Sequence, residues 1–289
     1  MERRPELSIV LPARNEAAAL RALLPDLRAR FPDAEILLVD DASEDETAQI
    51  GRDNGCRVVS HPYRIGNGAA VKTGIRTASG SIVALMDADG QHRPADLETL
   101  LERFRSGGFD MVVGARSMDG HASHRRWAAN GVFNRLASWM TNQRVVDLTS
   151  GFRVARTELL REFLSLLPNS FSYPTTLTMS FFRSGYTVDY VPVDVRDRVG
   201  ASHIRPFRDG VRFLLIIFKI GTLYSPLKLF LPVSLLLFVV ATALYGYTYL
   251  RSHQFTNMSA LLYTTSLLTF LIGLVSEQIT NLMYQMKGR

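Results

Sequence analysis

The stretch SIVALMDADGQH, residues 81–92, indicates both the fold of this chain and the place of its chemistry. Its first half is an apolar run with the length of a buried strand, and its second half is polar. Short apolar runs without alternation are typical of parallel strands that are covered on both faces. In such sheets, ligands bind beyond the carboxyl ends of the strands. The carboxylates of Asp87 and Asp89 stand at that position.

The same alternation of apolar runs with helical periodicity continues on both sides of this stretch. Strands are expected at Leu7–Leu11, Glu35–Asp40, Arg57–Ser60, Ser81–Asp87 and Asp110–Gly114. Helices are expected at Glu16–Arg30, from Ser43 toward Asn54, at Asn67–Ala78 and at Pro94–Arg105. Strands that alternate with helices predict an α/β domain around a parallel, doubly wound sheet. We place this domain at residues 1–205.

The remaining third of the chain has a different composition. The chain of 289 residues carries a net charge of +6, and residues 206–289 hold seven basic but only two acidic residues. Because residues 1–205 are nearly balanced in charge, the chain is not a uniformly basic protein, and we expect no nucleic-acid partner. The single cysteine, Cys56, excludes a disulfide framework.

Two long segments without charged residues lie in this C-terminal third, at Leu229–Leu250 and Ser252–Ser276. A helix with the length of the first segment spans about 33 Å, which is enough for a hydrocarbon core of about 30 Å. We therefore expect a two-helix transmembrane anchor at residues 229–289. A pair of buried core helices is the alternative interpretation.

Most of the basic residues lie on one side of the two segments, and Arg251 is the only charged residue of the connecting loop. Those outside the connecting loop are Arg208, Arg212, Lys219, Lys228, Lys287 and Arg289. By the positive-inside rule, the soluble domain and both termini are expected on the cytosolic side. Residues 206–228 combine apolar residues at helical spacing with basic residues, which predicts an amphipathic helix at the bilayer surface. A helix packed on the soluble domain is the alternative.

The pair Asp87 and Asp89 is the strongest chemical signal. Residues i and i+2 of extended backbone point to the same side, so the two carboxylates are expected to converge across Ala88. Such carboxylates repel each other unless a cation neutralises them, and Mg²⁺ or Mn²⁺ bridging to a diphosphate suits these oxygen ligands. Gln91 and His92 are near enough in sequence to add a neutral ligand. Helix capping by the two aspartates is the alternative.

Polar residues also follow the first two expected strands. Pro12–Glu16 (PARNE) and Asp40–Ser43 (DDAS) place amide and carboxylate groups where they can bond a base or a ribose, with helix capping as the alternative. In residues 61–72 (HPYRIGNGAAVK), Gly66 and Gly68 let a ligand approach the backbone closely. The third glycine of a dinucleotide fingerprint is missing there.

Six blocks, in this order, carry a resemblance to a known family. They are LPARNE (11–16), VDDAS (39–43), GNGAAVKTG (66–74), DADGQH (87–92), VVGAR (112–116) and TSGFR (149–153). Over about residues 7–203 the chain resembles glycosyltransferase family 2, and within it the polyprenyl-phosphate sugar synthases that use dolichyl or undecaprenyl phosphate. The resemblance implies a Rossmann-like GT-A domain with a parallel-rich sheet that binds a nucleotide-sugar.

The resemblance also implies roles for individual residues. The implied metal ligands are Asp87, Asp89 and Gln91. The implied nucleotide-sugar contacts are Pro12, Arg14, Glu16, Val39, Asp41, Asp87, Ala88, Asp89 and Arg116. The implied acceptor-side residues are Ser150, Arg153, Arg198, Ser202, His203 and Arg205. The implied catalytic residues are Asp89, Arg116 and Arg198, and Arg116 matches an arginine that contacts either the donor or the acceptor phosphate. His203 stands where many members of the family have lysine, and Arg205 is the candidate to supply that charge.

The expected function is a metal-dependent, inverting hexosyltransferase. It would move a sugar from a UDP- or GDP-sugar to a polyprenyl phosphate at the cytosolic face of the bilayer. A lipid phosphate is already an anion at neutral pH, so the site needs arginines to hold it more than a general base. The alternatives are another family 2 enzyme with a different membrane acceptor, and a non-catalytic scaffold that binds nucleotide-sugars. A homo-oligomer is compatible with the sequence.

Overall fold

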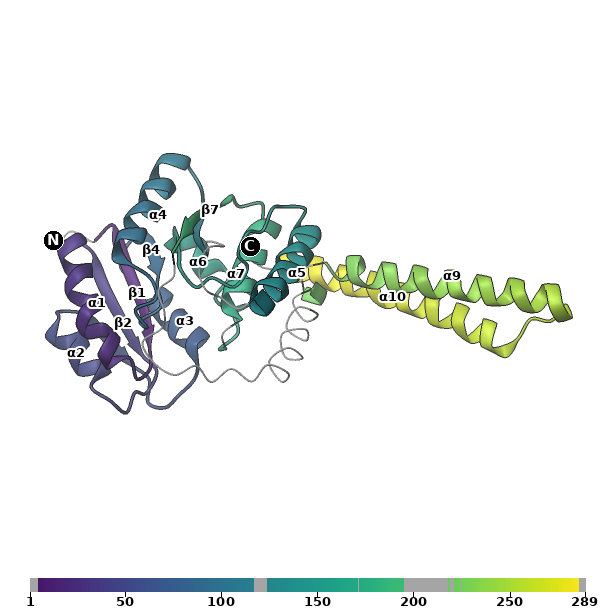
Figure 1. Ribbon diagram of the computed structural model, residues 1–289, viewed down its shortest axis with the longest axis horizontal. Helices are drawn as coiled ribbons and strands as arrows, with labels where there is room; N and C mark the ends of the chain where they lie inside the picture. Colours follow the sequence, from purple (N-terminus) through teal and green to yellow (C-terminus); the bar gives the residue numbers. More distant parts are fainter. Residues whose placement is uncertain are drawn as a thin grey trace. The chain divides into compact units, whose positions relative to one another are not determined.

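The computed structural model describes residues 5–116, 124–170, 172–194, 218, 221–223 and 225–285. The chain divides into two compact units, Met1–Ile204 and Arg205–Arg289. The first unit is an α/β domain, and the second contains two long helices (Figure 1).

The described part of the first unit is built on a seven-stranded sheet with the order β3-β2-β1-β4-β6-β5-β7. The strands are β1 (Leu7–Ala13), β2 (Glu35–Asp40), β3 (Arg57–Ser60), β4 (Ile82–Leu85), β5 (Met111–Arg116), β6 (Arg153–Arg156) and β7 (Val188–Val193). Neighbouring strands are parallel except at β6, which runs antiparallel to both β4 and β5.

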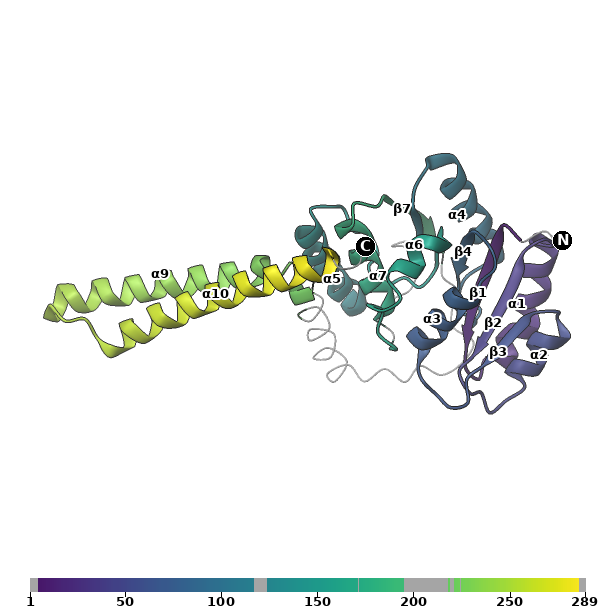
Figure 2. The same cartoon turned by 180° about the vertical axis from the view of Figure 1, so that it is seen from behind.

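Helices cover both faces of this sheet (Figures 1 and 2). They are α1 (Ala17–Arg30), α2 (Thr47–Asp53), α3 (Asn67–Thr77), α4 (Pro94–Gly107), α5 (His124–Thr141), α6 (Thr157–Glu162) and α7 (Tyr173–Arg183). Side chains alternate between the two faces of a strand. In β1, Ile9 and Leu11 therefore join the core under α1, α2 and α4, whereas Val10 joins the core under α3, α6 and α7.

The doubly wound, parallel-rich sheet that the sequence predicts is confirmed. The five expected strands and four expected helices are present, with ends that differ by a few residues. Strand β6 departs from the purely parallel order. It fills the space between β4 and β5, and its register places Arg153 beside Leu85. Because β6 runs in the opposite direction, its first residue lies at the edge where the parallel strands end.

Arg153, at the start of β6, is completely buried, with 0% of its surface exposed. Its Nη1 donates to the Pro174 carbonyl oxygen and to Thr178 Oγ1 of α7, both at 3.2 Å. Its Nη2 donates to the Ser150 carbonyl oxygen. Burial lowers the pKa of Arg153, and these oxygens compensate the buried charge. One guanidinium thus joins β6, α7 and the loop that precedes β6.

We predict that Arg153→Met lowers the free energy of unfolding by about 2–4 kcal/mol, because it leaves buried carbonyl oxygens without donors. The thermal unfolding midpoint of the full-length protein in detergent, followed by tryptophan fluorescence, measures this loss. Arg52→Met is the matched control, since Arg52 is exposed on α2. The control is expected to change stability by no more than about 0.5 kcal/mol. Equal stability of the two variants would contradict the prediction.

The second unit contains α9 (Pro226–Ser252) and α10 (Asn257–Gln285), which run side by side as a hairpin (Figure 2). Both helices are long and apolar enough to cross a membrane. Small residues at the interface allow close approach. Ser234 and Ser266 exchange hydrogen bonds from each Oγ to the other backbone oxygen, at 2.9 and 2.8 Å. Most of the large apolar side chains on these helices are exposed.

The start of α9 differs from the expected span. The helix begins at Pro226, three residues before the expected Leu229, and Glu277 Oε2 accepts a hydrogen bond from the Leu227 amide at 3.3 Å. A carboxylate at a helix N-terminus is stabilised by the amides and the helix dipole. This contact explains an acidic residue at the end of an apolar run. Most of the expected interfacial segment, 206–228, lies outside the described residues.

Candidate functional site

The loops that follow β1, β2, β4 and β5 share one edge of the sheet with the start of β6. The DADGQH block follows β4, and β4 lies between the two sides of this edge. The loops of β1 and β2 lie on one side, and β6 and β5 lie on the other. The sheet therefore brings five of the six sequence blocks to one edge, as expected for an α/β protein.

Asp87 and Asp89 lie in a turn after β4. The strand ends at Leu85, so a turn and not extended backbone arranges the two carboxylates, which corrects the expected geometry. Asp89 is 8% exposed, and its Oδ1 accepts a hydrogen bond from the Gln91 amide at 3.1 Å. Asp87 is half-buried and faces Gly151. A Cβ at position 151 would lie 3.0 Å from Asp87 Oδ2 and 2.9 Å from the Tyr173 hydroxyl.

The residues of this turn fit a divalent cation that is shared with a substrate. In the described part of the chain, no group of three or more His, Cys, Asp or Glu side chains is arranged to hold a metal. A Mg²⁺ or Mn²⁺ ion held by one or two carboxylates keeps positions for water and phosphate oxygens. The carboxylates of Asp87 and Asp89 and the side-chain amide oxygen of Gln91 would supply that kind of incomplete shell of oxygen ligands.

His92 belongs to the packing between two loops. It is 7% exposed, and its ring stacks on Phe152 with 4.5 Å between the ring centres. Burial, followed by the charge of Arg116, lowers the pKa of His92 to about 4. The imidazole is therefore neutral at physiological pH, and it joins the turn after β4 to the start of β6.

On the other side of β4, hydrogen bonds join the loops that follow β1 and β2. The Asn15 amide donates to Ser43 Oγ at 2.9 Å, and the Glu44 amide donates to Asn15 Oδ1 at 2.8 Å. Asn15 and Ala42 both have a left-handed backbone, with φ of 55° and 56°. Such backbone is uncommon outside glycine and is frequent at functional sites. Three other expected nucleotide contacts are buried along this edge, namely Pro12, Val39 and Ala88.

Arg14 projects from the end of β1 and is half-buried. Its Nε is buried and has no hydrogen-bond partner among the described residues. Its Nη2 lies 4.0 Å from Glu44, a carboxylate that is largely exposed. A buried donor without a partner is costly, so a ligand that supplies an acceptor there stabilises the site. Glu16, beside it, is half-buried, and its amide donates to Thr47 Oγ1 at 2.9 Å.

Asp41 holds the loop after β3. Its Oδ1 accepts from His61 Nδ1 at 2.8 Å and from the Ile65 amide at 2.9 Å, and its Oδ2 accepts from the Gly66 amide at 2.8 Å. Burial by itself raises the pKa of Asp41, but the hydrogen bonds from His61 and the two amides outweigh it and lower the pKa. Contact between Asp41 and a base or ribose would compete with these bonds.

The two glycines at the start of α3, Gly66 before its first residue and Gly68 in its first turn, allow close packing within the chain. A Cβ at Gly66 or Gly68 would collide with the backbone oxygens of residues 168–170. The Asn169 carbonyl oxygen also accepts a hydrogen bond from the Ala69 amide at 3.3 Å. The N-terminus of α3 is thus covered by backbone. This corrects the expectation that the glycines admit a ligand.

Arg116, at the end of β5, forms a two-point ion pair with Asp147. Its Nε and Nη2 lie 2.8 and 3.0 Å from the two carboxylate oxygens, and Nη2 also donates to Thr149 Oγ1. Burial by itself raises the pKa of Asp147, but the bonds and charge of Arg116 outweigh it and lower the pKa. Burial by itself lowers the pKa of Arg116, but the bonds and charge of Asp147, followed by the charge of Asp87, outweigh it and raise the pKa.

Asp147 is not among the residues predicted from the sequence. The sequence does contain a local pattern that indicates it. An aspartate often accepts hydrogen bonds from the backbone amides two and three residues later in a turn, which here are those of Thr149 and Ser150. The structure shows those bonds at 3.0 and 3.1 Å.

The remaining acceptor-side residues divide into two groups. Ser150 is buried and its Oγ donates to the Gly114 carbonyl oxygen at 2.7 Å. Arg153 is directed into the protein interior, which does not fit the expected contact with a phosphate. The others lie outside the described residues, namely Arg198, Ser202, His203 and Arg205.

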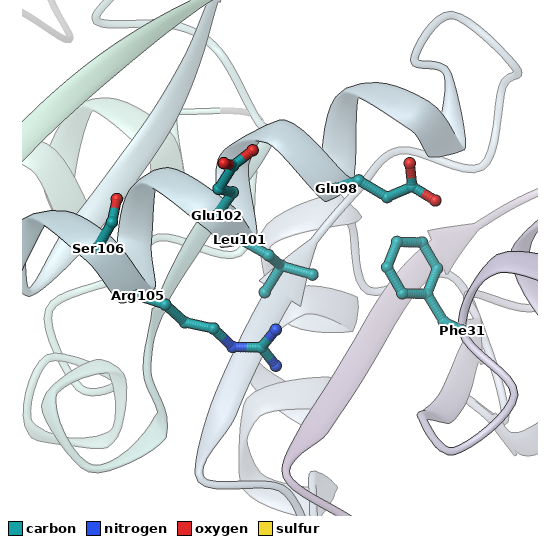
Figure 3. Close-up of a pocket in the computed structure, with 6 residues that line it drawn as sticks. All are labelled: Phe31, Glu98, Leu101, Glu102, Arg105 and Ser106. Carbon is teal, nitrogen blue, oxygen red and sulfur yellow. The ribbon is translucent and has the colours of Figure 1, made fainter.

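A separate hollow lies between α4 and the end of α1 (Figure 3). It is lined by Phe31, Glu98, Leu101, Glu102, Arg105 and Ser106. Arg105 pairs with Glu6, just before β1, at 3.0 Å. The hollow therefore lies toward the amino ends of the strands, away from the edge that carries the sequence blocks.

Comparisons with solved structures agree with this fold. Glucosyl-3-phosphoglycerate synthase from Mycobacterium tuberculosis, solved with Mn²⁺ and UDP-glucose, superposes with a TM-score of 0.60. The match has 23% sequence identity and covers 75% of this chain and 79% of the synthase.

Comparisons with known sequences give the family. Residues 8–164 match glycosyl transferase family 2, and residues 225–282 match the GtrB C-terminal hairpin. A dolichyl-phosphate hexose transferase of Haloferax volcanii is 31% identical, over 71% of this chain and 89% of the relative. An undecaprenyl-phosphate mannosyltransferase of Micrococcus luteus is 28% identical, over 65% and 83%. The chain therefore belongs to glycosyltransferase family 2 and is a glycosyltransferase.

Proposed function

We propose that this enzyme transfers a hexose from a UDP- or GDP-sugar to a polyprenyl phosphate at the cytosolic membrane surface, with a divalent metal and with inversion at the anomeric carbon. One observation carries the proposal. The metal-binding turn lies between the joined loops of β1 and β2 and the arginine-bearing end of β5. That order suits a nucleotide on one side, a diphosphate at the turn and an anionic acceptor on the other side.

The relatives support the same acceptor class. The Haloferax and Micrococcus proteins are named for transfer to dolichyl and undecaprenyl phosphate, respectively. The synthase from Mycobacterium tuberculosis binds Mn²⁺ and UDP-glucose on a similar fold. The match to a C-terminal hairpin and the two long apolar helices supply the membrane association that a lipid acceptor requires.

Each group at the edge has a task in this proposal. Asp87, Asp89 and Gln91 would hold the metal, which, when bound, would neutralise the departing nucleoside diphosphate. Arg14 would supply a donor to the nucleotide-sugar from the β1 side. Arg116, together with Arg198, would hold the acceptor phosphate in line with the anomeric carbon.

The reaction then needs no general base. A phosphate oxygen forms a bond to the anomeric carbon while the bond from that carbon to the diphosphate oxygen breaks on the opposite face. The nucleophile is already deprotonated, so no proton has to leave it. Proximity and fixed charges account for most of the rate in such a transfer.

The decisive experiment uses the full-length protein in detergent with a short polyprenyl phosphate. Radiolabelled UDP-glucose, UDP-galactose, UDP-GlcNAc and GDP-mannose are tested as donors, and the product is extracted into organic solvent. Transfer of one sugar to the lipid supports the proposal and identifies the donor. Transfer only to another membrane acceptor, or donor binding without transfer, would exclude it.

We predict that activity disappears in excess EDTA and returns with Mg²⁺ or Mn²⁺. Asp89→Asn should reduce kcat/KM at least 100-fold, more than the roughly 10–100-fold that follows loss of a residue supporting a metal ligand. Asp26→Asn is the matched control, since Asp26 is exposed on α1 and pairs with Arg30. Its activity should equal that of the unmodified enzyme. Full activity of Asp89→Asn in EDTA would refute the metal assignment.

The membrane orientation gives a second prediction. Cys56 is buried, so new cysteines can be labelled selectively in intact cells and in inverted vesicles. A cysteine at Gln254, between α9 and α10, should react from outside only, and one at Gly288 from inside only. The opposite pattern would place the sugar transfer on the outer face.

A further inference from the structure

We propose that Asp147 is a positioning residue for the acceptor. It would fix Arg116 so that one edge of the guanidinium faces the 147–151 loop and the other edge faces the acceptor phosphate. The inference rests on the proposed function, in which Arg116 holds the acceptor phosphate, and adds to it the residue that positions Arg116. The loop that carries Asp147 belongs to the acceptor side of the sheet edge.

The contacts of Arg116 divide its guanidinium into two parts. Nε and Nη2 face Asp147 at 2.8 and 3.0 Å, and Nη2 also reaches Thr149. Nη1 makes no hydrogen bond to the described residues. The Arg116 side chain is 43% exposed, whereas that of Asp147 is 9% exposed. The two nitrogens that bind Asp147 therefore lie against a buried carboxylate, and Nη1 of the partly exposed arginine is left to bind a ligand.

Asp147 itself is fully occupied. Its Oδ1 accepts from Arg116 Nη2, the Thr149 amide and hydroxyl and the Ser150 amide, at 3.0–3.2 Å. Its Oδ2 accepts from Arg116 Nε at 2.8 Å and from the Arg116 amide at 3.3 Å. A carboxylate with this many donors is held in its charged form. Asp147 is thus built to act through Arg116 and not to take a proton from a substrate.

The order of the strands assigns Arg116 to the acceptor. Strands β4 and β6 separate β5 from β1 and β2, whose loops carry the candidate nucleotide contacts. A free arginine side chain loses rotamer entropy when it is fixed. Since Asp147 and Thr149 fix Arg116 before a ligand arrives, less of that cost falls on acceptor binding.

The test is a set of variants of the full-length enzyme, assayed with the donor that the experiment above identifies. Asp147→Asn keeps the shape of the side chain but removes its charge. It should lower kcat/KM for the lipid phosphate roughly 10–100-fold, because small displacements of a positioning group are costly. The KM for the nucleotide-sugar should change less than twofold. Asp189→Asn is the matched control, since Asp189 pairs with Arg103 at 2.6 Å on β7, outside the site, and should behave like the unmodified enzyme.

A double-mutant cycle separates positioning from a structural role. If Asp147 acts through Arg116, Asp147→Asn should cause no further loss once Arg116 is replaced by alanine. Additive losses, or an effect on the nucleotide-sugar KM alone, would overturn the inference. Thr149→Val gives a second test if Asp147→Asn fails to fold, because it removes one contact of Arg116 and leaves the ion pair. It should lower kcat/KM for the lipid phosphate by a smaller factor, and an unchanged value would overturn the inference.

The outcomes for the two proposals are distinct. An unmodified enzyme that transfers no sugar to any polyprenyl phosphate overturns the proposed function, and the acceptor assignment of Arg116 with it. An unmodified enzyme that does transfer sugar, with additive losses in the cycle, overturns the positioning role alone.

Discussion

The antiparallel pairing of β6 between β4 and β5 determines the arrangement of the whole site. A parallel strand in that place would bring its last residues to the functional edge, whereas β6 brings its first. Arg153 then lies beside Leu85, and Gly151 faces the carboxylate of Asp87. The stacking of His92 on Phe152 joins the same two segments. The turn that carries Asp87 and Asp89 is therefore packed directly against the segment that leads into β6.

The two sides of the edge are stabilised in different ways. On the β1 and β2 side, backbone amides and short polar side chains hold the loops, with Asn15 and Ala42 in left-handed backbone. Local strain of this kind persists only where surrounding bonds compensate it. On the β5 and β6 side, two arginines hold the segments together. Arg153 fixes the loop from the interior, and Arg116 is fixed by that loop in turn.

The sequence predicts the first half of the domain well because its strands are buried on both faces and its helices are periodic. Strand β6 has four residues, and its direction depends on the strands on either side, which no local pattern reveals. Burial explains why the observed environment of Arg153 differs from the predicted one. Arg153 in TSGFR resembles a phosphate-binding arginine, but a sequence does not show which arginine the fold encloses. The turn around Asp147 is a local pattern, but its pairing with Arg116 is not visible in the sequence because the two residues are 31 positions apart.

The chemistry of the acceptor side favours a nucleophile that arrives already ionised. A hydroxyl acceptor requires a base near its oxygen with a proton affinity suited to neutral pH. Among the described residues there, Asp147 is saturated by donors that lower its pKa, and His92 is a buried, neutral ring with a pKa of about 4. Asp87 and Asp89 are assigned to the metal. A phosphate monoester needs no base, and it needs the fixed positive charge that Arg116 presents. The described acid and imidazole groups on this side are therefore consistent with the proposed lipid phosphate acceptor.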